Sequence, residues 1–130
     1  MELVAASTLA SIAITSTLTL MGSALDLSLD VENRKLATTL CVSKLEEHLA
    51  AVTIGFVEGT FTGDFSADGY SQMKFSVSRT TNASSGGLTD ALMVVQATVY
   101  MDNNSNNTLD SAEPYATMMT KVAKVTAWEF

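Results

Sequence analysis

The chain begins with a long uncharged segment, Leu3 to Leu25, in which 23 consecutive residues carry no charged side chain. Roughly 20 residues of α-helix, at about 1.5 Å per residue, cross the ~30 Å hydrocarbon core of a bilayer. From Glu2 to Ala51 there is no proline, and Gly22 is the only glycine. Because helix breakers are absent from this part of the chain, we expect one continuous helix of about 75 Å.

The uncharged segment is rich in small hydroxyl residues, unlike a simple aliphatic membrane anchor. Eight of its 23 residues are serine or threonine: Ser7, Thr8, Ser11, Thr15, Ser16, Thr17, Thr19 and Ser23. Such side chains allow helices to approach closely and can bond to the helix backbone. The alternative is a cleaved secretory signal with Gly22-Ser23-Ala24 as its cleavage site. Against this alternative, no Lys or Arg precedes the segment, and it is longer than a usual signal core.

Residues 26–52 have the pattern of an amphipathic helix. Leucines and a valine recur at mostly helical spacings, at Leu29, Leu36, Leu40, Leu45, Leu49 and Val52, with charged residues between them. We expect residues 26–52 to pack on a globular domain, while the apolar residues 1–25 protrude as a transmembrane or assembly helix. Asp30 precedes Arg34 by four residues, an orientation worth roughly 0.3 kcal/mol. We expect Cys41 to be a small buried hydrophobe and His48 to lie on the surface.

The remainder of the chain, residues 53–130, has the features of an antiparallel β domain. Six of the seven glycines lie between residues 55 and 87, so residues 53–70 are interpreted as a glycine-rich connection. Alternating side chains predict three strands, around 72–78, 91–101 and 115–127, with a polar turn at 80–89. Trp128 and Phe130 are expected to cap an edge strand or form a contact surface. A long helix across such a sheet is an α+β fold.

Residues 102–113 match the ligand pattern of a twelve-residue calcium-binding loop. Oxygen-bearing residues occupy its first, third, fifth, seventh, ninth and twelfth positions, namely Asp102, Asn104, Asn106, Thr108, Asp110 and Glu113. Thr108 would contribute its backbone carbonyl, and Leu109 occupies the position of an apolar anchor. The sixth position, usually glycine, is Asn107, which tolerates the left-handed conformation. The sequence therefore predicts Ca²⁺ as a structural cofactor.

Two features of this loop differ from the usual calcium-binding helix–loop–helix. The flanking segments have the pattern of strands, and Pro114 disfavours a helical exit. With three carboxylates we expect a dissociation constant of about 10⁻⁴ to 10⁻³ M, which suits extracellular calcium. The alternative is an Asn-rich hairpin loop that binds nothing.

Charge and composition exclude several other functions. The formal net charge is −7, so attraction to nucleic acid through overall charge is not expected. With one cysteine and one histidine, we expect neither an intramolecular disulfide nor a multi-histidine metal site. It contains no phosphate-binding loop and no nucleophile elbow, so we do not expect an enzyme.

The sequence Met-Glu-Leu-Val, the apolar segment after it and the amphipathic continuation ending in Lys-Leu-Glu-Glu-His-Leu-Ala resemble the type IV pilin-like superfamily. This superfamily includes type IV pilins and type II secretion pseudopilins, and residues 36–50 look most like its minor subunits. The resemblance covers about the first 50 residues closely, and the rest only in architecture. In this superfamily a leader is cleaved, and a glutamate stands four residues beyond the new N-terminus. Here only Met1 precedes Glu2, so we expect the leader and about three mature residues to be missing.

The resemblance implies a structural role. Subunits would wait in the inner membrane and then polymerise into a helical filament at the cell surface or in the periplasm, with copies of this chain and other pilin-like subunits. Some members also hold calcium in their globular domains. The resemblance identifies one set of assembly residues: Glu2, Leu3, Leu9, Ile12, Ile14, Leu18 and Leu20. Two alternatives are a monomeric, membrane-anchored, calcium-stabilised binding module and a signal-bearing secreted β protein.

Overall fold

The structure, a computed structural model, describes residues 2–125 as one long helix, four strands and two short 3₁₀ helices. In chain order these are α1 (Glu2–Ile54), β1 (Gly59–Phe65), η1 (Ser66–Asp68), β2 (Tyr70–Thr80), η2 (Ala83–Ser85), β3 (Leu92–Met101) and β4 (Tyr115–Ala123). The chain divides into two compact units between residues 32 and 33. The first unit consists of α1 up to Glu32. The second contains the rest of α1 and all four strands.

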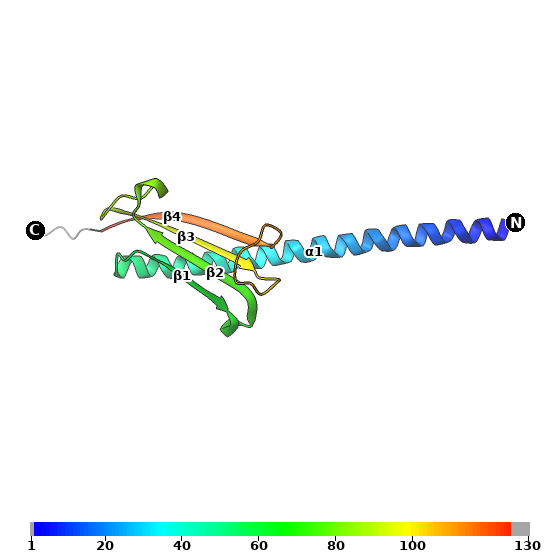
Figure 1. The fold of residues 1–130 in the computed structure, drawn as a ribbon, viewed down its shortest axis with the longest axis horizontal. Coiled ribbons are helices and arrows are strands. Elements are labelled where there is room, and N and C mark those ends of the chain that lie inside the picture. Colours follow the sequence, from blue (N-terminus) through cyan, green and yellow to red (C-terminus); the bar gives the residue numbers. More distant parts are fainter. Residues whose placement is uncertain (1, 126–130) are drawn as a thin grey trace, which may run out of the picture. The chain divides into compact units, whose positions relative to one another are not determined.

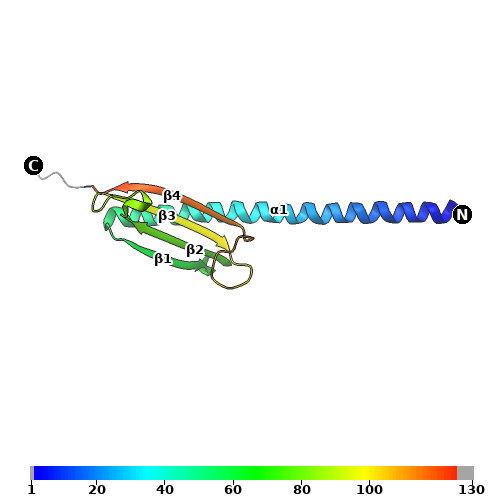
Figure 2. The ribbon, with the colours of Figure 1, turned by 45° about the horizontal axis from the view of Figure 1, so that its top comes forward.

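The second unit is an antiparallel sheet with a helix packed on one face. The strands lie in sequence order, β1-β2-β3-β4, and each pairs with the next in antiparallel orientation. Figures 1 and 2 show the C-terminal part of α1 lying along this sheet. The predicted α+β fold, a long N-terminal helix packed on an antiparallel sheet, is therefore confirmed.

The core of the second unit forms where α1 meets the inner face of β2 and β3. Its buried members are Ala37, Cys41, Val52, Phe65, Met73, Val77, Met93, Val95, Ala97 and Val99. The predicted leucine positions from Leu36 to Leu49 pack against this cluster. Cys41 is fully buried, as expected, and its thiol donates to the Ala97 carbonyl oxygen at 3.3 Å. The Cys41 thiol thus joins the helix to the middle of β3.

Strand β1 is a fourth strand where the sequence suggested only a connection. It pairs with β2 from Gly59↔Arg79 to Phe65↔Tyr70, and of its seven residues only Phe65 is buried. Such an exposed edge strand lacks the alternation by which strands are recognised. Gly63 also interrupts the pattern of side chains along β1. A Cβ at this position would lie 2.8 Å from the Phe75 ring, so the glycine allows that ring to pack directly against the edge strand.

The last predicted strand is shorter than expected, within the part of the chain that the structure describes. Strand β4 ends at Ala123, and its side chains alternate between half-buried and exposed. Met118 and Val122 pack against the core, whereas Met119 is exposed. The last two residues of the predicted strand, together with Trp128 and Phe130, lie outside the described residues.

Candidate assembly helix and candidate calcium loop

The predicted assembly residues lie on a helix whose apolar side chains are exposed. Between Leu3 and Leu25, Leu3 is 86% exposed and Ile14 60% exposed, with Leu9, Ile12, Leu18 and Leu20 between these values. These side chains lie all round the helix rather than along one stripe. Glu2 is exposed in the first turn, where a carboxylate complements the helix dipole. A helix that is apolar all round belongs in lipid or in the interior of an assembly.

The hydroxyl groups of this helix are bonded internally. All eight serines and threonines between Leu3 and Leu25 donate to a backbone carbonyl three or four residues earlier, at 2.8–3.1 Å. For example, Ser11 bonds to Ser7, Thr15 to Ser11, and Thr19 to Thr15. Because each hydroxyl has a partner within its own helix, the segment can enter an apolar environment without leaving a donor unpaired. This confirms the expected bonding of the hydroxyls to the backbone.

Helix α1 is long and apolar enough to cross a membrane. Its most apolar 18-residue window, near the N-terminus, has a mean hydropathy of 1.7, and none of its residues is buried. Length and composition therefore allow this part of α1 to be a membrane anchor.

The predicted calcium loop is closed at both ends by buried carboxylates. Asp102 and Glu113 are only 3% and 4% exposed. The Asp102 carboxylate accepts the backbone N–H groups of Asn106, at 3.1 Å, and Asn107, at 2.9 Å. The Glu113 carboxylate accepts those of Asn103 and Asp110, at 2.9 and 3.1 Å. Burial, and then the carboxylates of Asp102 and Glu113, raise the pKa of Tyr100 at the adjoining end of β3.

The side chains of Asn104 and Asn106 organise the interior of the loop around Asp110. Their Nδ2 atoms donate to the same oxygen, Oδ2 of Asp110, at 2.6 and 2.9 Å. Their Oδ1 atoms accept backbone N–H groups, that of Asn106 and that of Thr108 respectively. Asn107 has the expected left-handed backbone, with φ of 57°, and so does Ser105, with φ of 59°. The two amide groups thus lie against the carboxylate of Asp110, which is one of the predicted calcium ligands.

The predicted ligands lie in one loop, but their carboxylate and amide oxygen atoms accept hydrogen bonds from N–H groups of the loop itself. Calcium ligation would require Asn104 and Asn106 to turn their Oδ1 atoms inward, because calcium accepts oxygen ligands only. Among residues 2–125, no group of three or more His, Cys, Asp or Glu side chains is placed to hold a metal ion. The residue types fit calcium, whereas the hydrogen bonds describe a loop closed by its own amides. Calcium binding therefore stays a prediction.

A buried pair of polar residues, His48 and Arg79, lies between α1 and β2. His48 is 6% exposed, so the prediction of a surface histidine is wrong. Its Nδ1 accepts hydrogen bonds from Nε of Arg79 at 3.0 Å and from Nη2 at 2.7 Å. Since a guanidinium can only donate hydrogen bonds, Nδ1 of His48 carries no proton and the imidazole is neutral. The Phe61 ring of β1 covers the pair, 4.4 Å from the guanidinium carbon and 5.1 Å from the imidazole centre.

The sequence pattern could have predicted that both residues of this pair are buried. His48 lies seven residues after Cys41 and four before Val52, on the buried face of the helix. Arg79 continues the inward alternation of Phe75 and Val77 along β2. Burial, and then the positive charge of Arg79, lower the pKa of His48, with Lys44 acting in the same direction and Glu47 opposing it.

Comparison with known proteins adds no family assignment. The chain matches no family model, no curated protein and no solved structure.

Proposed function

We propose that this chain is a structural subunit of a pilus-like or pseudopilus filament, of the type IV pilin-like kind, that polymerises through residues 3–25. The observation that carries the proposal is the exposure of the apolar side chains all round that part of α1. Burying one leucine or isoleucine side chain is worth about 1.5–3 kcal/mol. A helix with this many exposed apolar side chains needs a lipid or protein environment, and a bundle of identical helices supplies the latter.

The internally bonded hydroxyls support a helix that moves between these two environments. In lipid, the serine and threonine side chains leave no unpaired donor, since each bonds to its own backbone. In a bundle, the same small side chains let neighbouring helices approach closely. A purely aliphatic anchor would be suited to lipid alone. The composition therefore favours a subunit that is first held in a membrane and then transferred to a filament.

In the proposed filament, Glu2 sets the axial register of the bundled helices. A carboxylate removed from water is costly unless a cation pairs with it. In the proposed filament, Glu2 meets a positive group of a neighbouring subunit, and this pairing fixes the axial position of each helix. The uncharged residues that follow tolerate many axial positions, so the register depends on the single acid.

The test is to replace Glu2 in cells that produce the full chain. We expect Glu2→Ala to leave the protein folded and membrane-bound, because the hydrophobic segment is unchanged, and to abolish filaments. The matched control is Glu46→Ala, which removes an exposed acid from the packed part of the same helix and should leave filament yield unchanged. Filaments would be counted by electron microscopy of sheared material. An unchanged yield for Glu2→Ala would refute the register role.

The alternative function is a monomeric, membrane-anchored binding module, which uses the same apolar helix only as an anchor. It predicts that residues 27–130 retain full binding activity and that no polymer forms. In both cases the loop at residues 102–113 is proposed to be a structural calcium site of the β domain. Its oxygen-bearing residues support that proposal.

A further inference from the structure

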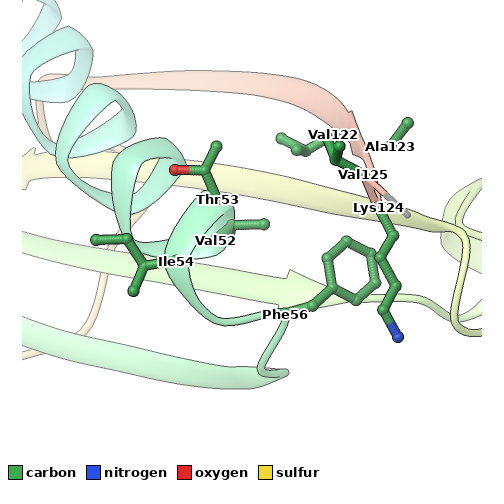
Figure 3. A pocket seen from close by; sticks show the side chains of 8 residues that line it. All are labelled: Val52, Thr53, Ile54, Phe56, Val122, Ala123, Lys124 and Val125. Carbon is green, nitrogen blue, oxygen red and sulfur yellow. The ribbon is translucent and has the colours of Figure 1, made fainter. Parts of the chain in front are cut away.

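One end of the second unit carries an apolar pocket beside a single positive charge. The pocket has a volume of about 220 Å³ and is lined by the last turn of α1, by Phe56 and by residues 122–125 (Figure 3). Two of its lining residues, Ile54 and Val125, are 91% and 90% exposed. Lys124 is the only ionisable residue in the lining, and its Nζ lies 5.6 Å from the centre of the Phe56 ring. A gathering of exposed aliphatic side chains is typical of a protein contact surface.

The opposite end of the same sheet presents an exposed apolar side chain next to an acid. Loop 102–113 follows the last residue of β3 (Figures 1 and 2). The pocket lies at the other end of this strand, where Leu92 pairs with Ala123. Leu109 is 39% exposed, in a loop whose other side chains are nearly all polar, and Asp110 follows it. Ten residues of strand separate the two ends by about 30 Å. Leu109 therefore cannot reach the pocket of its own chain.

The loop holds Leu109 in a defined position. Four backbone N–H groups are fixed by Asp102 and Glu113, and the side chains of Asn104 and Asn106 are fixed against Asp110. A loop ordered in this way loses little conformational entropy when it docks. Its net charge is negative, opposite to that of the pocket, since Asp102, Asp110 and Glu113 are its only ionisable residues.

We propose that loop 102–113 of one copy docks into the pocket of a second copy, with Leu109 entering between α1 and β4 and Asp110 facing Lys124. The contact joins opposite ends of the second unit, so it is heterologous, and its repetition generates an open polymer rather than a closed dimer. The inference rests on the proposed filament function and adds to it a contact between globular units.

The test is disulfide cross-linking in filaments of the full chain that carries Ile54→Cys and Leu109→Cys. Mild oxidation should give a ladder of dimers, trimers and longer products under denaturing, non-reducing conditions, because each subunit offers both ends of the contact. Mixed filaments of the two single variants should give dimers only. The natural Cys41 does not interfere, since it is fully buried and burial raises the pKa of its thiol.

Three control variants make the test specific. Thr60→Cys combined with Leu109→Cys places the first thiol on the exposed edge strand, at a residue that does not line the pocket, and should give no ladder. Lys124→Glu added to the 54/109 pair should slow cross-linking by about fivefold. Lys124→Arg should leave the rate unchanged, because it keeps the positive charge.

Several results would overturn the proposal. Filaments without a 54/109 cross-link would refute the contact and leave the filament function standing. Cross-linking of Ile54→Cys alone would show two pockets facing each other, which contradicts a head-to-tail contact. Protection of the thiol at position 54 in the detergent-dispersed monomer would show that the same chain covers the pocket. Failure of the wild-type chain to form filaments would instead refute the proposed function.

Discussion

Individual residues of the second unit show how polar groups are tolerated inside a small core. His48 and Arg79 are both nearly inaccessible, yet the guanidinium donates two hydrogen bonds to one ring nitrogen. This arrangement depends on a neutral imidazole, because a protonated ring has no acceptor at Nδ1 and adds a second positive charge. The pair therefore links the packing of α1 on β2 to pH.

We predict that mild acid weakens the packing of α1 on the sheet. The folded-state pKa of His48 lies below its ordinary value of 6.5, so stabilisation is complete above pH 6.5 and declines as the pH falls toward the folded-state pKa. The loss is about 1.4 kcal/mol for each unit between the two pKa values. The measurement is the urea midpoint at pH 7.5 and pH 5, followed by a brief thiol-labelling pulse on Cys41 at fixed pH.

The control for this prediction is His48→Asn, which keeps an acceptor near the position of Nδ1 but does not titrate. The urea midpoint of this variant should change less between pH 7.5 and pH 5 than that of the wild-type chain. Equal shifts in both proteins would assign the acid sensitivity to other groups.

Among the secondary-structure elements, those with strong local patterns were predictable and those that depend on long-range contacts were not. Helix α1 followed from the absence of breakers, and β3 from the alternation of Met93, Val95 and Ala97. Strand β1 could not be recognised, because an edge strand with one buried side chain has no periodicity. The position of His48 could have been derived from its helical phase relative to Cys41. The amide contacts of Asn104 depend on loop closure, which no spacing rule describes.

Close packing of β1 on Phe75 leads to a prediction at Gly63. Gly63→Ala should destabilise the second unit by about 1–3 kcal/mol, because the added Cβ would lie 2.8 Å from the Phe75 ring. Gly55→Ala is the matched control, since its Cβ would make only an ordinary 3.8 Å contact with Val57. The Cys41 labelling assay measures both variants. If Gly63→Ala destabilises a Phe75→Leu chain as much as it destabilises the wild-type chain, the steric explanation is wrong.

The loop at residues 102–113 leads to a prediction about metal binding. Calorimetric titration of the full chain in detergent with Ca²⁺ should give a dissociation constant of about 10⁻⁴ to 10⁻³ M. Asp102→Ala should abolish the signal, because it removes the first ligand and the anchor of two backbone N–H groups. Asn103→Ala, which changes a loop side chain outside the ligand pattern, should leave the signal intact. A flat curve for the wild-type chain would show that the loop is closed by its amides alone.

For the molecule as a whole, the chain forms two compact units, one made of α1 up to Glu32 and one made of the rest of α1 and the four strands. The second unit has its own core and could exist in water, whereas the first has no covered apolar surface of its own within residues 2–32. The proposed assembly through the first unit would account for an acidic domain joined to a helix rich in both aliphatic and hydroxyl residues. A simple anchor would need the aliphatic residues only.

The most direct test of this account is negative-stain electron microscopy, with an antibody against residues 33–125, of material sheared from the surface or released from the periplasm of cells that produce the chain. The account predicts filaments labelled along their length, with no filaments when Leu9 and Ile12 are both replaced by lysine. Recovery of the wild-type chain only as single molecules in the membrane fraction would contradict it.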